Sequence, residues 1–178
     1  TFASASNMLS MSAGLIPADF PITVNAVSGY TGGGKGLIAE FEAPAPAGTN
    51  DAFRTYGMTL AHKHVPEMTA HAGLEHAPIF APAVGRYAQG MLVEVPLALW
   101  ALAGKPSPGD LHAALAKAYA GERFVEVASA EECAELAKAR AGAGGYVAGL
   151  DPEALNGTNR MRLFVFGSAD GGQARLVA

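Results

Sequence analysis

The sequence predicts a single α+β domain over all 178 residues, in which helices cover one face of a mixed, mostly antiparallel sheet. Several short segments alternate between apolar and polar residues, which is typical of strands half-buried in a sheet. Most of them are separated by turns too short for a helical crossover, and this favours antiparallel neighbours. Other segments repeat apolar residues at helical spacing behind capping residues, and such helices pack against a sheet.

The first third of the chain is expected to contain a helix, a strand and a second helix. A helix over residues 2–13 would end at Gly14, because glycine suits the position after a helix. The strand covers residues 21–27, where Ile22, Val24 and Ala26 lie on one face. The following elements are a glycine-rich turn at 28–34, a helix at 35–41, a loop at 44–50 and an extended segment at 53–61.

Three more helices are marked by their ends. One begins at Pro66 and stops at Gly73, in accord with the preference for proline at the start and glycine after the end. A second is capped by Ser107 and stops at Gly121. The third runs from Ser129 to residue 140, and Glu132 completes the pattern of a capping box.

The remaining strands are expected to pair with their neighbours in sequence. Residues 79–87 and 91–100 are long enough to pair as a hairpin around Gly90. A short strand follows at 124–127. Residues 160–166 alternate, and the turn at 170–172 leads into a last strand at 174–178.

Composition and charge narrow the function classes. The chain has a formal net charge of -4 and lacks a basic stripe interleaved with aromatic residues, so nucleic acid is not an expected partner. Its longest apolar stretch is shorter than the ~20 residues that span a bilayer, so no membrane association is expected. The single cysteine, Cys133, excludes an internal disulfide framework and suits a cytoplasmic protein.

The glycine-rich turn between the first strand and its helix is the first candidate site. Successive peptide N–H groups in such a turn can bind an anion, and Lys35 adds a positive charge. The spacing is that of neither a phosphate-binding P-loop nor a dinucleotide fingerprint. A flexible connection without a ligand remains the alternative reading.

Two histidines, His62 and His64, form the second candidate. On an extended segment, residues two apart point to the same side, so the rings can form half of a metal site or an acid/base pair. A histidine that titrates near neutral pH is suited to proton transfer, and Glu67 can orient an imidazole. A solvated turn with incidental histidines is the alternative.

Cys133 is expected to be structural. It lies in the first turn of a predicted helix, where the helix dipole favours a thiolate. Glu131, Glu132 and Glu135 oppose this effect, because negative neighbours disfavour the charged thiol.

Several segments together resemble the N-acetyl-γ-glutamyl-phosphate reductase family in its shorter form. Any one segment is a weak signal, but the segments follow in order through nearly the whole chain. They are residues 13–19, 25–35 (Asn-Ala-Val-Ser-Gly-Tyr-Thr-Gly-Gly-Gly-Lys), 60–68 (Leu-Ala-His-Lys-His-Val-Pro-Glu-Met), 80–87, 89–91, 155–160 (Leu-Asn-Gly-Thr-Asn-Arg) and 163–167.

The resemblance implies an oxidoreductase of arginine biosynthesis that reduces N-acetyl-γ-glutamyl phosphate to its semialdehyde with NADPH and releases phosphate. It implies covalent catalysis, in which a cysteine thiolate forms a thioester that hydride then reduces. Family members bind NADP in a Rossmann domain. A second domain, with the fold of the C-terminal domain of glyceraldehyde-3-phosphate dehydrogenase-like reductases, serves catalysis and homodimerisation, and this chain resembles only that domain.

The resemblance also implies roles for the two candidate sites. His64 is expected to be the acid/base and His62 a contact to substrate or phosphate, with Glu67 supporting them from behind. The loop residues expected beside the substrate and the nicotinamide are Ser28, Gly29, Tyr30, Thr31, Gly32, Gly33, Gly34 and Lys35. Arg54 and Arg86 are assigned as carboxylate or phosphate ligands on their charge alone. No metal is expected.

The chain departs from the family pattern in its missing parts. The family nucleophile lies in a Gly-Cys-Tyr-x-Thr motif whose threonine matches Thr1, so the cysteine would fall three residues before the chain starts. The Rossmann fingerprint and the helix after the last strand are also absent, and serines replace apolar residues in the first helix. We therefore expect a domain that is inactive alone.

Two alternatives belong to other classes. One is a non-catalytic dimeric scaffold or pseudoenzyme of the same fold. The other is a relative that acts on a different acyl phosphate, such as an aminoadipate derivative.

Overall fold

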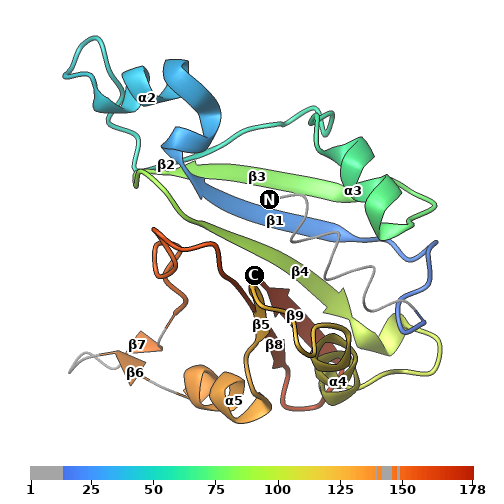
Figure 1. Ribbon diagram of the computed structural model, residues 1–178. Coiled ribbons are helices and arrows are strands. Elements are labelled where there is room, and N and C mark those ends of the chain that lie inside the picture. Colours follow the sequence, from blue (N-terminus) through green and yellow to red (C-terminus); the bar gives the residue numbers. More distant parts are fainter. Residues whose placement is uncertain (1–13, 139, 142–145, 148) are drawn as a thin grey trace.

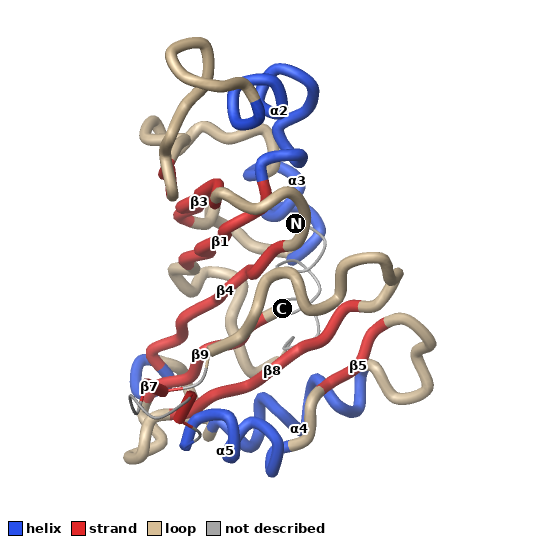
Figure 2. The backbone as a smooth tube through the Cα atoms, turned by 90° about the vertical axis from the view of Figure 1, so that its left-hand side faces the viewer, coloured by secondary structure: helices blue, strands red, loops and turns tan. Residues whose placement is uncertain are grey.

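In the computed structural model, which describes residues 14–138, 140–141, 146–147 and 149–178, seven strands form one mixed sheet. Their order is β2-β3-β1-β4-β9-β8-β5 (Figures 1 and 2). The strands are β1 (Thr23–Gly29), β2 (Phe53–Thr55), β3 (Ile79–Gly85), β4 (Met91–Ala98), β5 (Val125–Val127), β8 (Met161–Gly167) and β9 (Gln173–Val177). Four of the six described pairings are antiparallel, which confirms the predicted α+β class and its mixed, mostly antiparallel sheet.

The helices begin and end close to the residues that the sequence indicates. They are α2 (Gly34–Glu42), α3 (Val65–Ala72), α4 (Pro108–Ala118) and α5 (Ala130–Lys138). Ser107 and Asp110 form a reciprocal capping box at the start of α4, and Gly73 ends α3 in the left-handed region at φ 67°. The peptide N–H of Glu132 donates to Ser129 Oγ over 3.1 Å at the start of α5. The predicted helix over residues 2–13 lies outside the described residues.

The predicted hairpin between the strands on either side of Gly90 is wrong. β3 and β4 do not pair with each other, because β1 lies between them: it is parallel to β3 and antiparallel to β4. The loop over residues 86–90 therefore passes across the end of β1 instead of turning back on itself. Val24 and Ala26 are buried in β1, as befits a strand inside the sheet, and their burial is the physical reason for its central place.

Of two other predicted segments, one is shorter than expected and one is confirmed. The extended segment predicted over 53–61 shortens to β2, which ends at Thr55, and turns follow it. Gly57 has a φ of 70°, a left-handed conformation that interrupts a strand. The predicted hairpin around residues 170–172 is confirmed, since β8 and β9 pair antiparallel on either side of this turn.

The sheet is covered on both faces, although unequally. Helices α3 and α4 pack on one face, as predicted, where Met68 and Leu111 join the core residues Val93 and Leu176. Helix α5 differs: its Cys133 packs with Phe164 and Val177, which point to the opposite face of β8 and β9. Side chains alternate along a strand, and both sets in β8 are apolar, so β8 can bury a helix on each side.

The remaining described elements are small. A two-stranded sheet joins β6 (Arg140–Ala141) to β7 (Tyr146–Val147), and short 3-10 helices η1 (Tyr30–Gly33) and η2 (Leu99–Ala101) follow β1 and β4. In the described part of the chain, none of the helices combines the length and the apolar character that crossing a bilayer requires.

Replacing Gly29 by alanine is expected to destabilise the protein by about 2 kcal/mol, as overpacking does. Its φ of -64° suits any residue, so the cost would come from the added Cβ, which would lie 2.5 Å from the Ala88 carbonyl oxygen. Urea unfolding would measure the change. Gly36→Ala is the matched control, because a Cβ there meets nothing within 4 Å and alanine favours the helix by up to ~1 kcal/mol. Equal effects of the two substitutions would contradict the close approach at Gly29.

Candidate active site

A cavity of about 330 Å³ brings the two sequence candidates together. The glycine-rich loop contributes Ser28, Gly32 and Gly33 to its wall, and the histidine segment contributes His62, Lys63 and His64. Arg54 and Tyr56 complete the polar lining, and Phe80 lies among the apolar residues. The loop follows β1 and the histidines precede α3, so it is the pairing of β1 with β3 that carries two distant segments to one cavity.

His62 lies in the turn that enters α3 and not on a strand, so the predicted extended segment was wrong at this point. The two rings nevertheless meet, edge to face, with centroids 4.9 Å apart. The His62 carbonyl accepts from the peptide N–H of Val65 over 2.9 Å, and its ring Nδ1 accepts from the peptide N–H of His64 over 3.2 Å. The turn therefore fixes both the backbone and the ring of His62.

Aromatic side chains surround His62. The ring of Phe80 lies 5.1 Å from that of His62, and the ring of Tyr56 lies 5.7 Å from it. Burial lowers the pKa of His62, and the neighbouring His64 and Lys63 lower it further. Among the described residues, no three His, Cys, Asp or Glu side chains are grouped so that they could hold a metal ion. The acid/base role of the pair stays a prediction.

The glycine-rich loop uses its first peptide N–H groups within the fold. Gly29, Tyr30 and Thr31 donate to the carbonyls of Gly90, Tyr87 and Ala88 over 3.0 to 3.2 Å. The expectation that these three groups bind an anion is therefore wrong, because each is already satisfied by the loop that crosses β1. Ser28 and Gly32 line both cavities, Gly33 lines the smaller one, and Gly29 and Thr31 line the larger one. Lys35 is exposed and lines neither.

Two of the predicted ligands serve the fold around Phe41 instead. Tyr30 stacks on the buried Phe41 ring at 5.2 Å and its hydroxyl donates to Glu42 over 3.3 Å. Arg86 lies over the same ring and donates to the carbonyls of Phe41, Thr49 and Asp51. The Arg86 guanidinium is thus held by backbone carbonyls of residues 41–51 and lines neither cavity, and its assignment as a substrate ligand stays a prediction.

Arg54 both lines the cavity and takes part in ion pairs within the fold. It lines the cavity, yet its guanidinium donates to Glu40 over 2.7 Å and to Asp51 over 2.6 and 2.8 Å. Hydrogen bonds to both carboxylates raise the pKa of Arg54, and the bond from Arg54 holds the pKa of Asp51 below its usual value. Two carboxylates oppose its charge, so Arg54 would offer a substrate mainly its remaining hydrogen-bond donors.

Two further candidates lie away from the cavity lining. Glu67 is exposed in the first turn of α3, and its support of the histidines stays a prediction. Cys133 is buried in α5, and burial is the main cause that raises the pKa of its thiol. A raised thiol pKa disfavours the reactive thiolate, which agrees with the structural role predicted for Cys133.

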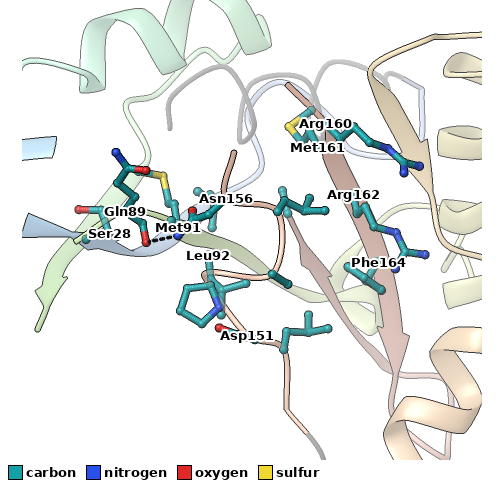
Figure 3. A pocket seen from close by; sticks show the side chains of 18 of the residues that line it. Ser28, Gln89, Met91, Leu92, Asp151, Asn156, Arg160, Met161, Arg162 and Phe164 are labelled. Carbon is teal, nitrogen blue, oxygen red and sulfur yellow. Dashed lines mark hydrogen bonds between the residues drawn. The ribbon is translucent and has the colours of Figure 1, made fainter. Parts of the chain in front are cut away.

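A larger cavity, of about 740 Å³, also has residues of the glycine-rich loop in its wall. Figure 3 shows Ser28, Gln89 and Asn156 among its lining residues. Ser28, Gly32 and Met91 line both cavities. The larger one continues past Gln89 and Asn156, whose side-chain amide donates to the Gln89 carbonyl over 3.2 Å. Sequence reasoning gave no site role to Gln89 or Asn156, although residues 89–91 and 155–160 were among the matching segments.

Two arginines at the far wall of this cavity, Arg160 and Arg162, were also missed. Arg162 binds Glu132 over 2.7 Å and Glu126 over 3.0 Å, and Arg160 also binds Glu126. The partners come from α5 and β5, which no spacing in the sequence connects to β8. Their alternation in a predicted strand was the available signal, because it placed both arginines on one face.

Comparisons with known proteins show the family of the chain. Residues 2–178 match the family model described as semialdehyde dehydrogenase, dimerisation domain. The chain is 50% identical over 169 residues to the proteins named N-acetyl-gamma-glutamyl-phosphate reductase of Brucella ovis and Brucella melitensis biotype 1, covering 93% of this chain and 50% of each relative. The predicted resemblance is therefore confirmed, and the chain spans about half the length of these curated relatives.

A solved structure supports the fold. The probable aspartate-semialdehyde dehydrogenase from Pseudomonas aeruginosa matches with a TM-score of 0.59 and 14% identity, over 98% of this chain and 54% of that one. At this identity the match shows the fold alone. The family match over residues 2–178 shows that the chain belongs to the semialdehyde dehydrogenase family, whose dimerisation domain it matches.

Proposed function

We propose that this chain is the catalytic and dimerisation half of an NADPH-dependent N-acetyl-γ-glutamyl-phosphate reductase of arginine biosynthesis. The observation that carries the proposal is the cavity in which His62 and His64 meet the glycine-rich loop. It occurs in a chain that is 50% identical over 93% of its length to reductases of this name.

The cavity suits an acyl phosphate. Lys63 places positive charge at its wall and Arg54 adds hydrogen-bond donors, and charge-assisted hydrogen bonds to phosphate are stronger than neutral ones. Phe80 and Leu37 add apolar surface for the carbon chain of the substrate. Lys63 was not among the residues assigned from the sequence, and we add it as a phosphate contact.

In the proposed reaction a cysteine thiol of the preceding domain attacks the acyl carbon. We assign His64 to take the thiol proton and to give it to the departing phosphate, so that a thioester remains. NADPH, when bound, supplies the hydride that converts the thioester to the semialdehyde and frees the cysteine, which regains a proton. His62 contacts the substrate from the same cavity, and Glu67 supports the pair from the first turn of α3.

The described residues offer a place for one end of the cofactor. Ser28 and Gly32 line both cavities, and Gly32 leaves the loop open because a Cβ there would come no closer than 3.9 Å to Ser28 Oγ. We assign these two residues to hold the nicotinamide end. In the described residues, no strand is followed by the dinucleotide-binding spacing of glycines, so the preceding domain would bind the rest.

The chain should be active only when joined to a Rossmann domain that carries the Gly-Cys-Tyr-x-Thr motif directly before Thr1. The assay is NADP-dependent oxidation of N-acetylglutamate semialdehyde in the presence of phosphate, with the missing half taken from a Brucella reductase. Activity of the chain alone would contradict the assignment of the nucleophile. Absence of activity in the joined protein as well would favour a non-catalytic scaffold.

Within that joined enzyme, His64→Ala should lower kcat by ~10²–10⁴, which is the usual contribution of a general acid or base. Steady-state kinetics would measure the loss. His76→Ala is the matched control, since His76 is exposed in the loop after α3 and lines neither cavity. A His64 variant as active as this control would rule out the acid/base role.

We also propose that the protein forms a homodimer through an extended face of its sheet and acts in the cytoplasm. The description of the matching family as a dimerisation domain supports the first point. The buried thiol of Cys133 suits a reducing compartment and supports the second.

Light scattering should therefore give the chain twice its 18.1 kDa mass, because an apolar sheet face buried between two copies would hold them together. The measured mass should stay constant on dilution through the micromolar range. A mass of one chain at all concentrations would contradict the homodimer.

A further inference from the structure

The turn that enters α3 determines which nitrogen of His62 can carry a proton. A peptide N–H is always a donor, and the peptide N–H of His64 points at Nδ1 of His62 over 3.2 Å. Nδ1 must then accept, so it carries no proton. In a neutral imidazole the proton is left on Nε2, and Nε2 becomes the ring nitrogen that can donate to a ligand in the cavity that His62 lines.

The surroundings of His62 disfavour a second proton. The rings of Phe80, Tyr56 and His64 replace water around the imidazole. The positive end of α3 begins at Val65, directly after the histidine segment, and repels an imidazolium. Each of these effects acts against the charged form of His62.

The cations around the cavity also disfavour a charged His62. The cations Lys63 and Arg54 line the cavity with His62, and His64 is the nearest titratable neighbour. Tyr56 is also titratable, but burial raises the pKa of its hydroxyl, so it stays neutral. The carboxylates Glu40 and Asp51 are both bound to Arg54.

We propose that His62 is held as a neutral imidazole protonated on Nε2, and that it stabilises the substrate carbonyl oxygen as a hydrogen-bond donor without acting as a base. This inference rests on the proposed function, whose acyl carbon gains a negative oxygen when the thiolate adds. Nε2–H would donate to that oxygen and keep its proton. When the C–O bond to phosphate breaks, the oxygen becomes a carbonyl again and no proton has moved through His62.

In this proposal the two histidines have different roles in the reaction. A base must accept a proton, and the only ring nitrogen of His62 without one is bound to its own chain. Proton transfer between thiol and phosphate therefore falls to His64. A neutral imidazole beside a helix N-terminus is a known type of electrophilic donor, because its N–H stabilises developing charge without first losing a proton.

The first test reads the protonation state of His62 in the chain by itself. Long-range ¹H–¹⁵N correlation spectra of ¹⁵N-histidine-labelled protein distinguish the two neutral tautomers and the imidazolium, and the signals absent from His62→Gln identify His62. We expect the Nε2–H tautomer to persist as the pH falls below 6.5, the ordinary value, because the pKa of His62 is lowered. The Nδ1–H tautomer, or protonation above pH 6.5, would overturn the inference.

The lowered pKa of His62 also predicts how the stability of the folded chain changes with pH. The unfolded chain takes up its proton on this histidine at a higher pH than the folded chain does. The contribution of His62 to stability is therefore fully present above pH 6.5 and is lost as the pH falls toward the lowered folded value. Urea unfolding of the chain should show a smaller acid loss in His62→Gln than in the unaltered protein.

The second test uses the joined enzyme. His62→Ala should lower kcat by ~10²–10³, as loss of one donor to a developing oxyanion does. His62→Gln keeps an amide N–H near the position of Nε2 but cannot act as a base, so it should recover at least ~10-fold of that loss, or about 1.4 kcal/mol. Equal activities of the two variants would overturn the donor role.

The two tests separate two kinds of failure. The spectra need no activity, so a wrong tautomer overturns this inference even in a working reductase. A joined enzyme that is inactive without any substitution overturns the proposed function, even when the spectra show the expected tautomer.

Discussion

Three peptide hydrogen bonds tie the end of β1 and the two residues after it to the loop between β3 and β4, beside the loop residues that line both cavities. They let β1 enter the sheet between two strands that follow each other in sequence. Gly29 allows the crossing, since a side chain there would strike the Ala88 carbonyl. The loop that follows then separates the smaller cavity from the larger one, and Ser28 and Gly32 face both. A backbone crossing, which no single side chain specifies, thus places the site.

Arginines divide into those that build this frame and those that can meet a ligand. Arg86 gives its donors to three carbonyls and lies over Phe41, so it fixes the loop over residues 41–51. That loop supplies Asp51, which with Glu40 holds Arg54 at the cavity wall. A fixed arginine loses little further freedom on binding, although its charge is partly balanced. Lys63 lines the cavity and its charge is exposed to solvent, which suits an incoming anion.

The two histidines are neighbours with different surroundings, and this difference gives them different protonation states. His62 is fixed at its carbonyl and at Nδ1 by the turn that begins α3, and aromatic rings shield it. His64 stands at the start of the helix itself. When two similar groups differ in environment, their protonation states separate, and one can donate while the other exchanges protons. The proposed reduction needs both a hydrogen-bond donor and a group that transfers protons at one acyl carbon.

The local elements could be predicted from the amino-acid sequence: the alternation of β1 and β8, the caps of α4 and α5 and the turn between β8 and β9 depend on residues close in the chain. The family resemblance and the choice of His62 and His64 as candidates also came from the sequence. The folded chain was needed to show that β3 and β4 flank β1, that α5 covers the second face, and that Arg86 and Tyr30 support Phe41. The reason is physical: periodicity shows which face a residue occupies, whereas strand order and the partners of a charge or a peptide N–H are chosen by segments far apart, through the competition of many contacts at once.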